Sequence, residues 1–186
     1  GVFAYSPKDG SSRLLFRSPD VDISGWSTDP TGKPWVFSYD DHYPRYWYPD
    51  PQHPLAEIHQ WLTTTYPGFR IDVDSTTADM SHVMARLASP RLPLVFLHVD
   101  VKNKKALNSL TAYPALKPED LADVEAIEFR TRDGLMVRGF LTVPNVPDKK
   151  RLPTIVMVHG GPHGPYDAYG FDSEAQLFAS RGYAVL

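Results

Sequence analysis

The chain has 186 residues with a formal net charge of -3, which gives no reason to expect nucleic acid or an anionic membrane as a partner. Apolar residues make up 42% and charged residues 22% of the chain, ordinary fractions for a globular protein with one or two domains and a real core. Cysteine is absent, so disulfides, thiolate nucleophiles and zinc–thiolate sites are excluded.

The first forty residues predict short β-strands. The predicted strands cover residues 2–5, 12–16, 21–26 and 35–39, and turn-forming residues separate them, as at residues 7–10. Strands at this spacing, joined by turns that contain Gly, Pro and Asp, are typical of the blades of a β-propeller. No exact internal repeat accompanies them.

The segment 40–48 is rich in aromatic residues and contains Asp40, Asp41 and His42. A binding platform or a metal site would use such residues. Because one histidine and two adjacent aspartates make an incomplete set of metal ligands, we predict a packed loop between strands here. The remaining histidines are scattered, without the helical spacing and acidic partner of a metal site. We therefore expect neither a metal nor a cofactor.

The middle of the chain predicts a helix followed by a meander of strands. Residues 54–62 place Leu55, Ile58 and Leu62 on one helical face. Strands are predicted at residues 70–75, 81–87 and 94–99, the last two containing His82 and His98, with a turn at 89–93. The charge run 102–105 is interpreted as a solvated loop.

A domain boundary is predicted in the proline-rich, polar segment 113–120. Beyond it, the runs 126–131 and 135–140 flank Asp133-Gly134, which is a strong signal for a β-hairpin. The apolar run 154–158 then predicts a buried strand, and residues 183–186 predict another.

A helix is predicted between these last two strands. Asp172 or Ser173 can cap it, and Ser173 with Gln176 fits a capping box. Ala175, Phe178 and Ala179 share one helical face, and Gly182 is placed to end the helix. The resulting strand–loop–helix–strand unit is the building block of a parallel sheet.

The loop of this unit begins with His159-Gly160-Gly161-Pro162. A glycine pair between a strand and a helix is where α/β-hydrolases build half of the oxyanion hole, because backbone amides must approach the negative oxygen closely. Our candidate donor is the amide of Gly161, since Pro162 has none. We expect His159 to bond the loop, with Gly160 and Pro162 supporting its shape. The alternative is a Gly-Pro-rich turn of the kind that follows many buried strands.

Residues 152–162 and 170–186 resemble the prolyl oligopeptidase family of serine peptidases, and most of all its acylaminoacyl-peptidase and dipeptidyl-aminopeptidase-like branch. Residues 132–134 and 139–144 are similar to the segment that opens the family's peptidase domain, and the strong likeness covers residues 124–186. Residues 43–46 resemble the end of the family's propeller. The resemblance implies the C-terminal part of a β-propeller at 1–118 and the N-terminal part of an α/β-hydrolase domain at 119–186.

No G-x-S-x-G motif occurs in the chain, and the nearest string, residues 25–29, lacks the final glycine. The resemblance implies that the whole catalytic triad lies beyond Leu186, so that His163, Asp167 and Asp172 are not members of it. Both ends look like cuts through a larger protein, and this chain alone is expected to be inactive. The leading hypothesis is a serine peptidase acting on short peptides; the alternatives are a carboxylesterase and a non-catalytic propeller binding module.

Overall fold

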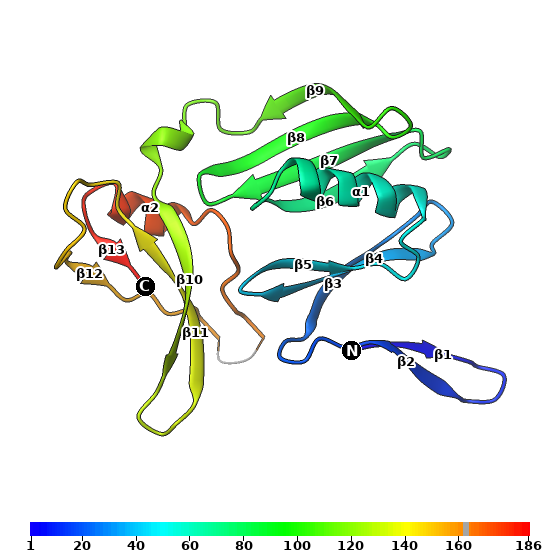
Figure 1. Cartoon of the computed structure of the whole chain (residues 1–186), viewed down its shortest axis with the longest axis horizontal. Helices are drawn as coiled ribbons and strands as arrows, with labels where there is room; N and C mark the ends of the chain where they lie inside the picture. The colour runs from blue at the N-terminus through cyan, green and yellow to red at the C-terminus, as the bar shows by residue number, and fades with distance from the viewer. Residues whose placement is uncertain (162–163) are drawn as a thin grey trace.

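The computed structural model of the chain describes residues 1–161 and 164–186. Within these residues the chain forms separate sheets in sequence order, with two α-helices packed on them, and no sheet closes into a barrel (Figure 1). The fold is therefore mostly β. Neither α-helix of the described ranges has the length and apolar character required to cross a bilayer.

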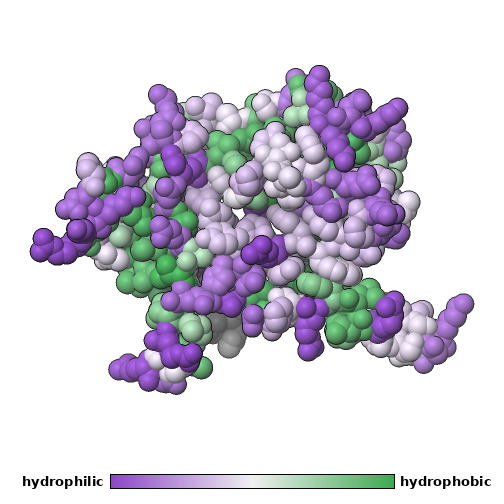
Figure 2. Space-filling view, viewed as in Figure 1, coloured by the Kyte–Doolittle hydropathy of each residue, from purple (hydrophilic) through white to green (hydrophobic). Residues whose placement is uncertain are grey.

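The first two sheets are antiparallel and consist of neighbouring strands. Their strands are β1 (Val2–Tyr5) with β2 (Ser12–Phe16), and β3 (Ile23–Thr28) with β4 (Pro34–Asp41) and β5 (Tyr43–Trp47). The four predicted strands are confirmed. Figure 2 shows apolar surface over the β1–β2 hairpin, where Phe3 and Leu14 are exposed.

Strand β5 corrects the prediction of a loop at residues 40–48. Asp41 pairs with Tyr43 across the single residue His42, which takes a left-handed φ of 60° and so allows a very tight turn. The aromatic side chains then pack as cross-strand neighbours. Trp47 lies 5.7 Å from Phe37 and stacks on Phe16 at 5.0 Å, measured between ring centroids.

The third sheet is an antiparallel meander. It consists of β6 (Arg70–Thr76), β7 (His82–Ser89), β8 (Leu92–Asp100) and β9 (Lys105–Thr111). The predicted strands of this region are confirmed, and Lys102 and Lys104 are exposed as expected. Strand β9 is an addition to the prediction: its side chains are mostly exposed, so the sequence lacks the apolar alternation of a half-buried strand.

Helix α1 (Pro54–Thr65) packs on this sheet and builds the main core with it. Leu55, Ile58 and Leu62 are fully buried, as the predicted helical face requires. The helix runs three residues further than predicted, through Thr63, Thr64 and Thr65, each of which donates a hydroxyl hydrogen bond to a carbonyl in the preceding turn. The polar groups of these low-propensity residues are thereby satisfied within the helix.

The fourth sheet has the order β10-β11-β13-β12. Its strands are β10 (Asp123–Arg130), β11 (Met136–Val143), β12 (Thr154–Ile155) and β13 (Ala184–Val185). The hairpin at Asp133-Gly134 is confirmed, with Gly134 at a φ of 89°. The parallel pairing of β12 with β13 confirms the strand–helix–strand unit. Strand β12 is shorter than the predicted run 154–158: Met157 still donates to the carbonyl of Leu186, but Val158 is 86% exposed.

Helix α2 (Ser173–Ala179) connects β12 to β13 and begins at the cap Asp172, whose Oδ1 accepts from the Ala175 amide at 2.7 Å. The predicted capping box of Ser173 and Gln176 is wrong. Gln176 is only 6% exposed and faces the start of β10, where its side chain binds other backbone groups. Gly182, at a φ of 88°, follows the helix as predicted.

Candidate functional site

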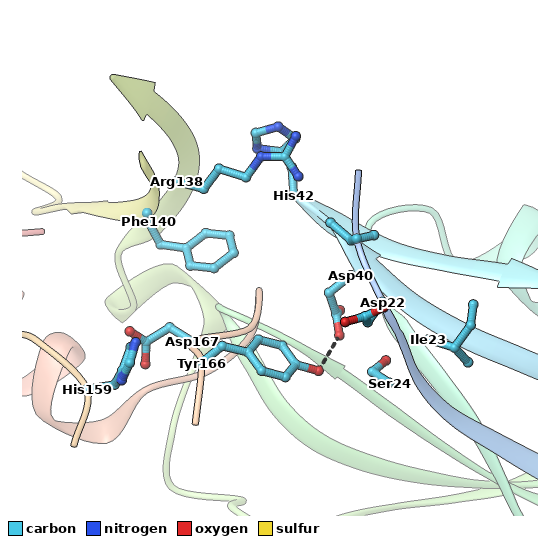
Figure 3. A pocket seen from close by; sticks show the side chains of 12 residues that line it. Asp22, Ile23, Ser24, Asp40, His42, Arg138, Phe140, His159, Tyr166 and Asp167 are labelled. Atoms are coloured by element: carbon cyan, nitrogen blue, oxygen red, sulfur yellow. Dashed lines mark hydrogen bonds between the residues drawn. The ribbon is translucent and has the colours of Figure 1, made fainter. Parts of the chain in front are cut away.

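A cavity of about 390 Å³ lies where the first 50 residues meet the sheet of β10–β13. Three stretches line it (Figure 3): residues 21–24 with Asp40 and His42, residues 138–140 of β11, and His159, Tyr166 and Asp167 after β12. The sheet of β3–β5 and the fourth sheet thus each supply one side of the cavity. A space of this volume is within the range of ligand pockets.

The glycine corner, residues 159–161, adjoins this cavity through His159. Strand β12 ends at Ile155, and the chain then leads through Met157 to His159, which lines the cavity, and to the exposed Gly160 and Gly161. A Cβ atom added at Gly160 would meet no atom of the described residues within 4 Å. The corner is therefore open, as access to an acyl group requires.

His159 is turned toward its own loop. Its Nδ1 lies 2.8 Å from the carbonyl oxygen of Gly160, so Nδ1 carries the proton and donates it. Pro162, which was predicted to support the motif, and His163 lie outside the described residues.

One contact across the cavity joins Tyr166 to Asp40. The Tyr166 hydroxyl donates to Oδ2 of Asp40 at 3.2 Å, and Arg70 of β6 forms an ion pair with the other carboxylate oxygen (Figure 3 shows the first of these contacts). The Asp40 side chain is 10% exposed. A buried carboxylate with both oxygens bound is a rigid anchor.

A second set of polar contacts lies at the edge of the cavity. Glu128 of β10 accepts from Arg138 Nε at 3.0 Å and lies 2.9 Å from His42 Nε2, while Arg138 also reaches Asp41 at 3.3 Å. These side chains are a quarter or more exposed, so each pair contributes little to stability. These contacts join the β4–β5 turn to the β10–β11 hairpin and so help to fix the two relative to each other.

Aromatic side chains also pack between the sheet of β3–β5 and the fourth sheet. Tyr169 packs edge-on against Tyr43 at 4.9 Å and lies 6.2 Å from Phe140, measured between ring centroids. Burial raises the pKa of Tyr169, so its hydroxyl stays neutral at physiological pH.

The structure does not assemble a Ser-His-Asp triad from the residues singled out in the sequence. Asp172 caps helix α2, and Ser27, in the string nearest to a nucleophile motif, lies in strand β3 and not at a strand-to-helix turn. Among residues 1–161 and 164–186, no group of three or more histidine, aspartate or glutamate side chains is placed to hold a metal.

Sequence reasoning missed the pairing of Tyr166 with Asp40. The two residues are 126 positions apart, and neither belongs to a motif. Only the fold brings them together, so no local pattern could have indicated the contact.

Comparisons with known proteins point to one group of peptidases. No family model matches the chain. Dipeptidyl aminopeptidase BIII of Pseudoxanthomonas mexicana is 28% identical over 193 residues, which cover 100% of this chain and 27% of the relative. Dipeptidyl peptidase family member 6 of Caenorhabditis elegans is 30% identical over 148 residues, covering 68% of this chain and 20% of the relative. The chain thus spans about a quarter of the length of these curated relatives.

Solved structures share the fold. Oligopeptidase B from Trypanosoma brucei, in its closed form with covalently bound antipain, matches 96% of this chain and 26% of its own with a TM-score of 0.64 and 20% identity. At this identity the likeness concerns the fold alone. Together, the peptidase relatives and the shared fold confirm that the chain resembles the prolyl oligopeptidase family of serine peptidases.

Proposed function

We propose that the complete protein is a serine peptidase that hydrolyses short peptides through an acyl-enzyme. In this proposal, residues 1–118 are the C-terminal part of a propeller domain and residues 119–186 open the α/β-hydrolase domain. The nucleophile and the rest of the triad follow Leu186 in the complete protein. The names of the curated relatives favour a peptidase over an esterase.

Within this reaction, Gly161 donates its backbone amide to the oxygen that becomes negative when the nucleophile attacks the carbonyl. Gly160 lets the chain bend without a side chain in the path of the acyl group, and Pro162 removes a competing donor. His159 holds the bend through its bond to the Gly160 carbonyl. Each of these proposed roles depends on the backbone conformation of the bend.

The observation that carries the proposal is the openness of the glycine corner at a cavity. Gly160 and Gly161 are exposed five and six residues after the end of β12, which pairs in parallel with β13, and the neighbouring His159 lines the space of about 390 Å³. An exposed bend that begins at a cavity is the kind of backbone from which an oxyanion donor can act.

The test replaces Gly161 by proline, which deletes the donor. In the complete protein, Gly161→Pro should lower kcat for a peptide p-nitroanilide by about a hundredfold to a thousandfold, the usual effect of losing one oxyanion-hole donor. Gly170→Ala, in the same connection and far from any donor role, is the matched control and should retain activity. Unchanged turnover in Gly161→Pro would contradict the assigned role.

Labelling and substrate assays on the complete protein distinguish the peptidase from the carboxylesterase and from the non-catalytic binding module. A fluorophosphonate probe should label the complete wild-type protein at a serine and leave the isolated residues 1–186 unlabelled. Preference for a carboxylic ester, with no cleavage of the matching peptide amide, would support the esterase. A complete protein that stays unlabelled and cleaves neither substrate would support the binding module.

A further inference from the structure

The connection from the glycine corner to helix α2 has few hydrogen bonds of its own, although the rings of Tyr169 and Phe171 pack on neighbouring aromatic side chains. Residues 164–171 form no helix or strand. Within the part of the chain that the structure describes, no backbone hydrogen bond holds these residues, and the bond from Tyr166 to Asp40 is the one side-chain hydrogen bond that does. Besides this ring packing, the bond from Tyr166 is therefore the main polar contact that can fix the position of the segment.

The acceptor of that bond lies in a strand, whereas the donor lies in an irregular segment. Asp40 lies in strand β4, is 10% exposed, and is paired with Arg70 of the neighbouring sheet. Its position is therefore set by two sheets of the N-terminal part of the chain. The Tyr166 side chain reaches across the cavity to it (Figure 3).

The glycine corner needs such an anchor. Before the glycine corner, the last backbone hydrogen bond among the described residues runs from the Met157 amide to the Leu186 carbonyl, and Val158 is exposed. At the corner, a Cβ atom on Gly160 would touch nothing among the described residues. Among the described residues, packing around Gly160 thus leaves room for the chain to shift, although an oxyanion donor must be held within a fraction of an ångström to be effective.

We infer that Tyr166 is a positioning residue for the oxyanion hole, acting through its hydrogen bond to Asp40. The inference rests on the proposed function and adds that the N-terminal part of the chain takes part in setting the geometry of the reaction. Tyr166 does not touch the reacting atoms in this account. It holds the chain at residue 166, five positions after Gly161, and so limits how far the Gly161 amide can move.

The experiment compares two tyrosines of the same segment in the complete protein. Tyr166→Phe keeps the ring and deletes the hydroxyl that binds Asp40. Tyr169→Phe is the matched control, because its ring packs against Tyr43 while its hydroxyl makes no hydrogen bond to a described residue. Each variant is assayed for kcat and KM on a peptide p-nitroanilide, for inhibition by a peptide aldehyde, and for thermal stability.

We expect Tyr166→Phe to lower kcat by about tenfold, the effect of one hydrogen bond to a charged group, and to leave KM within twofold. Binding of the aldehyde, whose adduct carries the oxyanion, should weaken by the same factor, while inhibition by the released peptide product and the Tm stay unchanged. Tyr169→Phe should behave as the wild type. A merely structural role would change the Tm and would not separate the aldehyde from the product.

A double-mutant cycle tests whether Tyr166→Phe lowers kcat through the lost hydrogen bond to Asp40. In the background of Asp40→Asn, which removes the charged acceptor, Tyr166→Phe should cause less than a twofold further loss of kcat. Full loss in that background, unchanged kcat in Tyr166→Phe, or an equal loss in Tyr169→Phe would each overturn the inference while the wild type remains an active peptidase. A wild type without any hydrolase activity would instead overturn the proposed function, and this inference with it.

Discussion

His59 of helix α1 is a buried titratable residue whose two ring nitrogens both form hydrogen bonds. Its side chain is 1% exposed, with Nε2 donating to the Ile71 carbonyl at 2.9 Å and Nδ1 accepting from the Tyr48 hydroxyl at 2.8 Å. Both ring nitrogens are satisfied by the neutral form. Burial lowers the pKa of His59 below its ordinary value of 6.5.

This lowered pKa predicts a loss of stability in mild acid. Below pH 6.5 the unfolded chain binds a proton at His59 that the folded chain does not, so the free energy of unfolding falls as the pH drops through that value. The contribution of this residue is at most about 1.4 kcal/mol per pH unit. Urea denaturation between pH 7.5 and 5 measures it.

The matched variant is His59→Gln, which can still donate to Ile71 but does not titrate. It should be less stable than the wild type at pH 7.5 and should show a flatter pH dependence below pH 6.5. The same slope in both proteins would assign the acid sensitivity to other groups. The carboxyls of Asp9 and Asp79 do not interfere, because hydrogen bonds from neighbouring hydroxyl and amide groups keep their pKa at about 2.

Among single residues, the sequence predicted the structure best where the backbone conformation requires glycine. Gly134 and Gly182 were correctly placed, because only glycine takes a left-handed φ without strain at a tight turn or a helix end. His42 adopts the same conformation without being glycine, and for that reason the turn before β5 escaped prediction.

At the scale of elements, helix α2 is attached to its sheet through Gln176. The Ala122 amide donates to Oε1 of Gln176 at 2.8 Å, and Nε2 donates to the carbonyls of Ala122 at 3.0 Å and Pro90 at 3.1 Å. One side chain thus links the helix, the start of β10 and the β7–β8 turn. Pro90 and Ala122 lie on the two sides of the predicted domain boundary.

We predict that Gln176→Ala lowers the free energy of unfolding by about 3 kcal/mol, because it leaves buried backbone groups without partners. Leu177→Ala, at the next position of the same helix, is the control: Leu177 is 49% exposed, so the loss there should stay below about 1 kcal/mol. Urea titration of the complete protein gives both values. Equal losses in the two variants would show that the link is not a source of stability.

The capping box failed as a prediction at this scale for a physical reason. A glutamine three residues after a serine has two ways to satisfy its amide, and the sequence does not reveal which backbone groups come near. Burial against Ala122 decided in favour of the long-range partner. Strand β9 was missed because its mostly exposed side chains lack apolar alternation, although it pairs with the adjacent β8. Strand β12 is shorter than predicted, and its pairing with the distant β13 could not be derived from local pattern.

At the scale of the whole molecule, the cavity exists only because two regions distant in sequence meet. Residues 21–24 and Asp40 belong to the N-terminal part, while His159 and Tyr166 follow β12. The sequence predicted most strands, both helices and the glycine corner, because these depend on local periodicity and turn chemistry. It could not predict which side chains face each other across the cavity.

The most direct measurement is a crystal structure of the complete protein with a peptide aldehyde bound to its serine. The account predicts that the oxygen of the adduct lies about 2.7–3.1 Å from the amide nitrogen of Gly161. An adduct whose oxygen is held by other donors, with the Gly161 nitrogen beyond hydrogen-bond distance or pointing away, would contradict it.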